Sequence, residues 1–251
     1  MQWQGEAIVV SVKPFSEKEA VAEVFSREHG MYRAIAKGAL SSRQRGTFQP
    51  GNLVFCRWNA RLAEQMGTLV CELLEPNAAW AMQSQKTLTA LNAITSLLDL
   101  TLHERDAHPW LYDRVRLAIR AVAEGGEWQF AYLLFERDLL RECGFGLDLS
   151  ECVATGATSE LIYVSPKSGR AVSSAAGEPY KEKLFRLPGC LLGDGAPKPA
   201  EILDGLRITG YFIQEWLLSP QEAKMPPARE RLVELLGNDA PAILEVSSPL
   251  L

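Results

Sequence analysis

Six cations with no acidic residue near them in sequence form the most distinctive chemistry of this chain. The window from His29 to Ala63 contains no Asp and no Glu, although the whole chain carries a formal net charge of −5. Guanidinium groups bind phosphate oxygens through paired hydrogen bonds. A positive segment on an acidic protein therefore indicates a surface that holds a polyanion. The cations of the window are Arg33, Lys37, Arg43, Arg45, Arg57 and Arg61.

Aromatic residues are interleaved with these cations, at Tyr32, Phe48, Phe55 and Trp58. Proteins that hold single-stranded nucleic acid typically combine cations, which contact the phosphates, with aromatic rings, which stack on the bases. Phe48 could stack on a base or could instead close the mouth of a barrel, whereas Trp58 is better explained as core. Lys13 would extend the cationic surface. The candidate nucleic-acid-binding residues are therefore Lys13, Arg33, Lys37, Arg43, Arg45, Phe48, Arg57 and Arg61.

The sequence offers no recognisable catalytic or metal-binding pattern. Only three histidines occur, and the group His103, Glu104, Asp106 and His108 lacks the spacing of a His-Glu-x-x-His zinc helix. Neither a Gly-x-Ser-x-Gly elbow nor a phosphate-binding P-loop is present. The five cysteines are odd in number and widely spaced, which predicts free thiols rather than a disulfide framework. We expect a protein that is not an enzyme.

Five short strands are predicted to position the cationic window. Alternating apolar residues and turn signals delimit them, and Glu28 to Gly30 forms a tight reversal between the second and third. In the third strand, Arg33 and Lys37 share a face because side chains repeat every two residues. Five antiparallel strands of this length predict a small barrel of the OB or SH3-like type. The predicted strands are 6–12, 19–26, 31–37, 52–58 and 66–74, with a loop at 38–51.

After Pro76 the pattern changes from strands to helices. Apolar residues at spacings of three and four predict a helical bundle, interrupted by a turn-rich insert at about 147–195. The fold class is therefore α+β, with a barrel domain at 1–76 and a helical domain at 77–251. No signal peptide or membrane span is expected, so we expect a cytoplasmic protein. The predicted helices are 84–105, 109–125, 128–143, 200–218 and 227–236, and the tail at 238–251 has no clear pattern.

The order of these parts resembles the RecO family of bacterial DNA-repair and recombination-mediator proteins. The likeness extends from the N-terminus to about Leu236, and it rests on the order and spacing of several short strings. These strings are Gly5–Val10, Gly30–Ala39, Gly46–Val54, Phe135–Leu140, and Gly144–Gly146 followed by Cys152.

The resemblance implies a non-catalytic, nucleoid-associated protein with an OB-type barrel. Members of the family bind single- and double-stranded DNA and anneal complementary strands. With RecR they help to load RecA on strands covered by single-strand-binding protein, and they contact the acidic C-terminal tail of that protein. Arg137 and Arg141, one helical turn apart, could receive such a tail, although Arg141 could simply stabilise a helix C-terminus.

The resemblance also raises the question of zinc, because many members carry a four-cysteine module in the insert. Here Cys152 is present, but Thr155 stands where the second thiol of a Cys-x-x-Cys would fall. Ser173–Ala176 occupies the region of the second pair. We therefore expect neither zinc nor any other cofactor.

Two other functions remain open from the residues alone. The barrel could belong to an adaptor that binds an acidic polypeptide. It could also bind RNA, since the choice between RNA and DNA depends on contacts to the 2′-hydroxyl.

Overall fold

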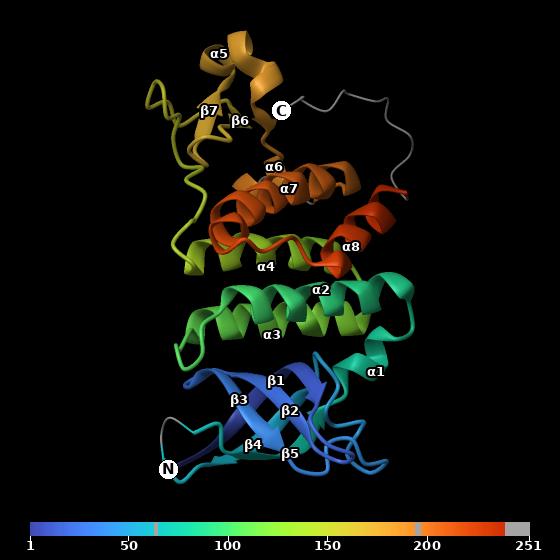
Figure 1. Cartoon of the computed structure of the whole chain (residues 1–251). Helices are drawn as coiled ribbons and strands as arrows, with labels where there is room; N and C mark the ends of the chain where they lie inside the picture. Colours follow the sequence, from blue (N-terminus) through green and yellow to red (C-terminus); the bar gives the residue numbers. More distant parts are fainter. Residues whose placement is uncertain (63–64, 194–196, 239–251) are drawn as a thin grey trace. The chain divides into compact units, whose positions relative to one another are not determined.

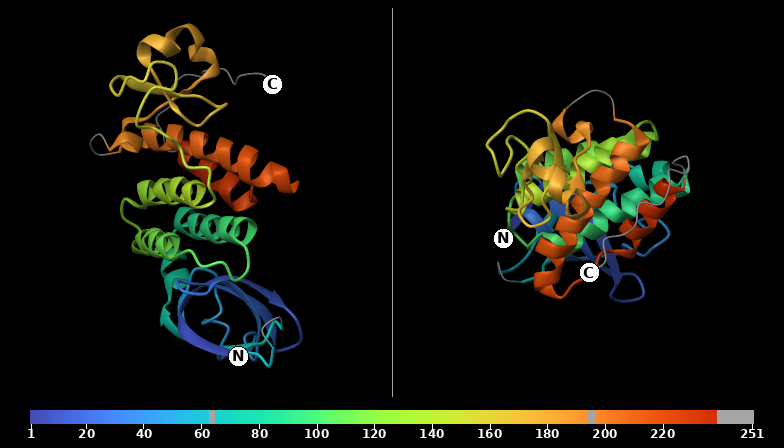
Figure 2. Two further views of the ribbon diagram at one scale, coloured as in Figure 1. Left: turned by 90° about the vertical axis from the view of Figure 1, so that its left-hand side faces the viewer. Right: turned by 90° about the horizontal axis from the view of Figure 1, so that it is seen from above.

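In the computed structural model, which describes residues 1–62, 65–193 and 197–238, the first five strands close into a barrel (Figure 1). Their order around the barrel is β1-β2-β3-β5-β4, and Figure 2 (left) shows the barrel end-on as a ring. All five predicted strands are confirmed within a few residues at each end. The strands are β1 (Gln2–Pro14), β2 (Ala20–Ser26), β3 (Gly30–Ala36), β4 (Leu53–Asn59) and β5 (Thr68–Glu75).

The long first strand makes the closure possible. β1 pairs antiparallel with both β2 and β4, and a bulge between Val9 and Ser11 lets it bend from one partner to the other. A short parallel pairing, Ile35 with Thr68 and Ala36 with Leu69, joins β3 to β5. This topology confirms the OB-type barrel rather than the SH3-like alternative.

Small side chains fill much of the barrel interior. Five strand alanines point inward and are completely buried, as the narrow bore of a five-stranded barrel requires. Larger residues, including Trp58 and Leu69, complete the core, so the prediction that Trp58 is core is confirmed. All five cysteines are free, as predicted. The inward alanines are Ala7, Ala20, Ala22, Ala34 and Ala36.

Three helices follow the barrel: α1 (Asn77–Ala81), α2 (Gln85–Thr101) and α3 (Pro109–Glu124). α2 and α3 pack on each other, and Phe25 of β2 meets Tyr112 of α3 edge-on at 5.5 Å (Figure 1). The hydroxyl of Ser84 caps α2 by accepting from the Lys86 N–H. α3 begins at a proline and ends at Gly125 in the left-handed conformation.

The helix predicted at 84–105 is wrong at its C-terminal end, because α2 stops at Thr101. The chain leaves the helix at Leu102, and the Arg105 N–H donates to the Met31 carbonyl of β3 at 2.8 Å. A bridge between Met31 and Glu104 accompanies this bond. The sheet edge therefore captures a segment that by periodicity alone would continue as helix.

The chain divides into two compact units, and the division runs through two of its helices. The first unit is Met1–Tyr132 with Pro226–Leu232, and the second contains the remaining described residues. α4 (Trp128–Glu142) and α8 (Pro227–Gly237) contribute to both. The domain boundary predicted near residue 76 coincides with the change from strands to helices, whereas the first unit also includes α1, α2 and α3.

The second unit contains the predicted turn-rich insert and the helix that follows it. Its small sheet has the order β7-β6-β8, and α7 continues through a π-helical turn, η2. Among the described residues, no helix combines the length and apolar character needed to cross a bilayer. The elements are β6 (Leu161–Val164), β7 (Ala171–Ser173), α5 (Ser174–Gly177), η1 (Glu178–Lys183), β8 (Phe185–Arg186), α6 (Gly189–Leu192), α7 (Pro199–Phe212), η2 (Ile213–Leu218) and η3 (Ser219–Gln221).

Substitution of Gly51 by Ala is expected to lower the free energy of unfolding by about 1–3 kcal/mol. Gly51 has φ of +89°, and a Cβ atom there would collide with the Leu91 side chain of α2. Urea denaturation measures the effect. Gly46→Ala is the matched control, because an added Cβ meets open space there. Equal stability of the two variants would contradict this account.

Candidate nucleic-acid interface

The loop that carries Arg43 and Arg45 is ordered by successive turns and anchored in the barrel. The Arg45 N–H donates to the Ser41 carbonyl at 2.9 Å, and the Phe48 N–H to the Gln44 carbonyl at 3.2 Å. The Phe48 ring enters the barrel core. Both arginine side chains are exposed on this framework.

Asn52, which is 1% exposed, ties this loop to its neighbours. Its side-chain amide donates to the carbonyls of Gly46, at 2.8 Å, and Thr47, at 3.2 Å. Its side-chain oxygen accepts from the Ala78 N–H of α1 at 3.0 Å. The cationic loop is thus held against both the barrel and α1, with an open groove of about 550 Å³ beside Arg45 and Met82.

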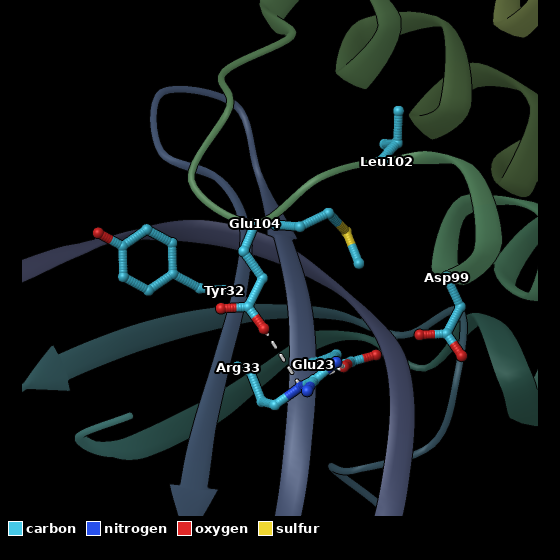
Figure 3. Close-up of a pocket in the computed structure, with 7 residues that line it drawn as sticks. Glu23, Tyr32, Arg33, Asp99, Leu102 and Glu104 are labelled. Carbon is cyan, nitrogen blue, oxygen red and sulfur yellow. Dashed lines mark hydrogen bonds and ion pairs between the residues drawn. The ribbon is translucent and has the colours of Figure 1, made fainter. Parts of the chain in front are cut away.

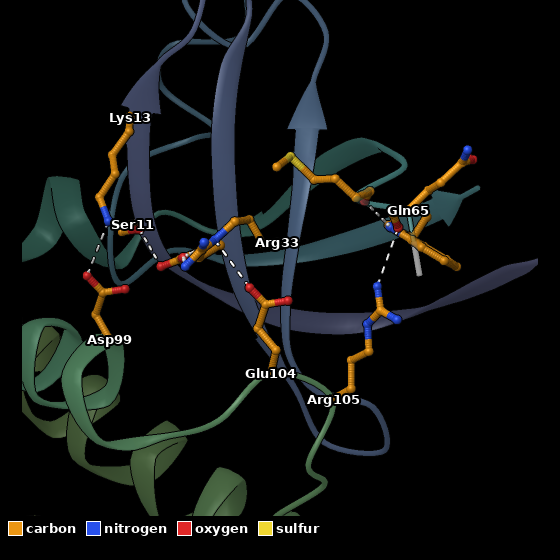
Figure 4. Close-up of polar contacts among 10 residues, drawn as sticks. Ser11, Lys13, Arg33, Gln65, Asp99, Glu104 and Arg105 are labelled. Atoms are coloured by element: carbon orange, nitrogen blue, oxygen red, sulfur yellow. Dashed lines mark hydrogen bonds and ion pairs between the residues drawn. The ribbon is translucent and has the colours of Figure 1, made fainter. Parts of the chain in front are cut away.

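Three of the candidate cations are engaged by carboxylates, and Figure 4 shows two of them, Lys13 and Arg33. Lys13 lies 3.6 Å from Asp99 of α2, and Arg57 lies 2.9 Å from Glu72 of β5. Arg33 pairs with Glu23 and, at 3.3 Å, with Glu104. These ion pairs reduce the charge that Lys13, Arg33 and Arg57 offer to a polyanion.

The other four candidate cations, Lys37, Arg43, Arg45 and Arg61, are exposed and make no ion pair within the described part of the chain. Lys37 directly follows β3, and Arg61 lies two residues beyond the end of β4. The last residues of these two strands pair with the start of β5, through Ala36 with Leu69 and Asn59 with Thr68.

The predicted stacking role of Phe48 conflicts with its burial. The side chain is 4% exposed and belongs to the barrel core. Its ring cannot meet a base without leaving that core, which would cost the free energy of burying an aromatic side chain. The alternative prediction, that Phe48 closes the barrel, describes its position.

Carboxylates cluster on the outer side of β2 and β3 and surround a small cavity of about 30 Å³ (Figure 3). Burial alone raises the pKa of Glu23, but hydrogen bonds with Asp99, Ser11 and Arg33 outweigh it and lower this pKa. Burial and the bond to Glu23 raise the pKa of Asp99 to about 6. Glu104 completes the cluster, so the cations on this side of the barrel are largely neutralised and offer little positive charge to phosphates.

An aromatic group that the residue pattern did not predict lies at one end of the barrel. Trp3 lies opposite Trp58 in the pairing of β1 with β4, and its ring stacks on His29 at 4.8 Å. Tyr32 contacts the same rings edge-on. The pairing of β1 with β4 brings these rings together, and the sequence pattern does not specify that pairing.

The predicted partner-binding arginines lie on α4. The Arg137 guanidinium pairs with Asp138 at 2.8 Å, and Asp138 is 1% exposed. Arg141 is exposed in the last turn of the helix. A partner site here stays a prediction.

The protein belongs to the class that combines an OB-type barrel with a helical region and a small inserted sheet. A family model described as "Recombination protein O N terminal" matches residues 1–77, and one described as "Recombination protein O C terminal" matches residues 82–224. These matches cover most of the chain, which therefore belongs to the RecO family.

Relatives at about 40% identity agree with this assignment. Proteins named "DNA repair protein RecO" are 42% identical over 236 residues in Rhodospirillum centenum and 41% identical over 240 residues in Granulibacter bethesdensis. The alignments cover 93% of this chain and 94% of the first relative, and 94% of this chain and 96% of the second. The relative from a Caulobacter species is 38% identical over 94% of this chain.

The residues around Cys152 do not fit the zinc module that the family resemblance implies. Cys152 is buried, and its Sγ accepts from the Ser173 N–H at 3.2 Å. Although burial raises the pKa of a thiol, hydrogen bonds from Ser173, Thr155 and Ala154 outweigh it and lower the pKa of Cys152 to about 6. Across the described residues, no group of three or more His, Cys, Asp or Glu side chains is placed to bind a metal. A single thiol with Thr155 and Ser173 beside it does not supply the four ligands of such a module.

Substitution of Cys152 by Ala is expected to lower the free energy of unfolding by about 1–3 kcal/mol, because the buried Ser173 N–H loses its acceptor. A zinc chelator is expected to leave the thermal midpoint of the wild-type protein unchanged. Differential scanning calorimetry measures both. Cys143→Ala is the control, since that thiol is only half-buried. A chelator-induced drop in the midpoint would contradict the metal-free account.

Substitution of Asp99 by Asn is expected to stabilise the protein increasingly as the pH rises from about 4 to 7. The folded-state pKa of Asp99, about 6, lies above its ordinary value of 3.8. The folded state therefore binds the extra proton, and the stability from this group is lost as the pH rises through that interval. The gain at pH 7 relative to pH 4 should be on the order of 1 kcal/mol.

Urea denaturation at several pH values tests this expectation. Asp113→Asn is the opposing control, because a hydrogen bond from Arg27 lowers the pKa of Asp113. That substitution should cost stability as the pH rises above about 4, the usual range of an aspartate. A pH-independent effect of Asp99→Asn would rule out the raised pKa.

Proposed function

We propose that this protein is a non-catalytic DNA-binding protein of recombinational repair, acting in the cytoplasm on the nucleoid. Membership of the RecO family and the names of its relatives support the role in DNA repair. The observation that carries the binding proposal is a set of exposed cations on the barrel unit that make no ion pair with any residue the structure describes. Those cations are Lys37, Arg43, Arg45 and Arg61.

The proposed contact follows the phosphate backbone and does not read sequence. Arg43 and Arg45 project from an ordered loop, so binding orders little additional backbone and costs little entropy. Ion pairs with Glu23, Asp99 and Glu104 leave the outer side of β2 and β3 with little positive charge for phosphates. Binding single and double strands alike is expected of such a surface, because both present phosphates.

Annealing follows from the same electrostatics. Two complementary strands repel each other through their phosphates, and a cationic surface that holds one strand screens that repulsion for the second. No covalent step is needed, so we propose no nucleophile, no general base and no cofactor.

We further propose that the protein acts with RecR to place RecA on strands covered by single-strand-binding protein. The acidic tail of that protein would bind near Arg141 on α4. Arg137, whose guanidinium pairs with Asp138 at 2.8 Å, lies one helical turn before it and would form part of the same site. A strand-pairing assay with and without single-strand-binding protein tests this step, and identical annealing rates on bare and covered strands in the presence of RecR would support it.

Replacement of Lys37, Arg43, Arg45 and Arg61 by Glu is expected to weaken binding to a labelled single-stranded oligonucleotide more than tenfold at low salt. Each lost phosphate contact also removes about 0.7 from the salt slope of the affinity, so the slope should fall by about 3. Fluorescence anisotropy across a salt series measures both quantities, after circular dichroism has established folding.

A charge-matched control separates a local site from net charge. Lys167, Lys183, Arg186 and Lys224 are exposed cations of the second unit. Their replacement by Glu changes the net charge equally and should leave the salt slope unchanged. Equal losses in both variants would mean that only overall charge governs binding, and the proposed site would be abandoned.

A further inference from the structure

Three aromatic rings form a stack that runs from the barrel core toward the surface. The Trp58 and Trp3 rings are 6.5 Å apart with an angle of 18° between their planes. The Trp3 and His29 rings are 4.8 Å apart at 27°. Trp58 is buried, whereas Trp3 and His29 are both half-buried, and His29 is the outermost ring of the stack.

Tyr32 supports this stack from the side. Its ring meets Trp58 edge-on at 5.1 Å, Trp3 at 5.2 Å and His29 at 6.2 Å, with angles between 73° and 81°. Edge-to-face contacts of this kind stabilise ring orientation. The imidazole is therefore aligned by two neighbouring rings.

The turn that carries His29 is fixed at both of its ends. Arg27 forms two hydrogen bonds to the Asp113 carboxylate, at 2.9 and 3.0 Å. Gly30 packs so tightly against the Asp106 backbone that a Cβ atom would collide with it. A half-buried ring on a fixed turn loses little conformational entropy when its accessible face binds a ligand.

Cations flank the stack. The Arg105 guanidinium lies 5.4 Å from the centre of the Tyr32 ring, and Figure 4 shows it directed toward Gln65, whose carbonyl it reaches at 3.4 Å. Arg61 follows Ala60, whose N–H donates to the Met1 carbonyl at the start of β1. Both cations thus belong to the end of the barrel at which Trp3 lies.

We infer that His29 is a stacking site for one unpaired nucleobase, with Arg61 and Arg105 positioned for the adjacent phosphates. Every base presents a π face, so this contact is independent of sequence. Bases within a duplex are already stacked on each other, so the site favours single strands. The inference rests on the proposed DNA binding, and it assigns to His29 the base-stacking role that the buried Phe48 cannot fill.

An abasic oligonucleotide of equal length separates stacking from charge, because it keeps the phosphates and lacks the bases. Wild-type protein should bind an ordinary single strand about fivefold or more tightly than the abasic strand. His29→Ala should remove most of this preference and leave the affinity for the abasic strand unchanged. His29→Phe should retain the preference, since it keeps a ring without the imidazole nitrogens. His103→Ala, which removes an exposed histidine elsewhere in the same unit, is the matched control.

Photocrosslinking with a strand that contains 5-iodouridine supplies a second readout, and the adduct should map to the peptide that contains His29. If His29→Ala lost affinity for both strands alike, the residue would act on the phosphates and not on the bases, and the inference would be overturned. An unchanged preference for the ordinary strand in His29→Ala would overturn it too. So would a His29→Ala variant that lost binding to an acidic peptide while its oligonucleotide binding stayed unchanged. If the wild type bound neither strand, the proposed function itself would fail.

Discussion

One buried amide holds the cationic loop in place. Asn52 donates from its side chain to two carbonyls of the loop and accepts the Ala78 N–H of α1, while its backbone carbonyl accepts from Val9 of β1. A buried amide with all these partners is costly to misplace, since each unmade bond leaves a polar group unsatisfied. The positions of Arg43 and Arg45 therefore depend on a residue that carries no charge itself.

Electrostatics divides the barrel into two sides with opposite properties. Toward α2, carboxylates engage Lys13 and Arg33 and raise the pKa of Asp99 to about 6. At the loop after β3 and beyond the end of β4, the cations stay exposed without ion pairs in the described chain. The side toward α2 therefore offers a polyanion little unpaired positive charge, and the attraction is concentrated on the other side.

Local pattern predicted the elements well, but it could not predict their pairing. Apolar runs, alternation and turn signals located all five strands, whereas the OB topology depends on the pairing of Ala36 with Leu69. The helix at 84–105 ended early because Met31, distant in sequence, captures Arg105. The ion pairs of Arg33 and the stack at His29 likewise join segments far apart in the chain. A window without acidic residues in the sequence therefore did not guarantee that its cations are unpaired in the folded protein.

The alanines inside the barrel have a consequence for how such a protein can diversify. Ala22 and Ala34 face inward with no room beside them, so a larger residue at either position forces strands apart unless another shrinks. Side chains such as Val24, Trp58 and Leu69 occupy the bore beside them. New binding preferences must then arise from loops and termini, which can change length and composition while the strands beneath them keep their spacing.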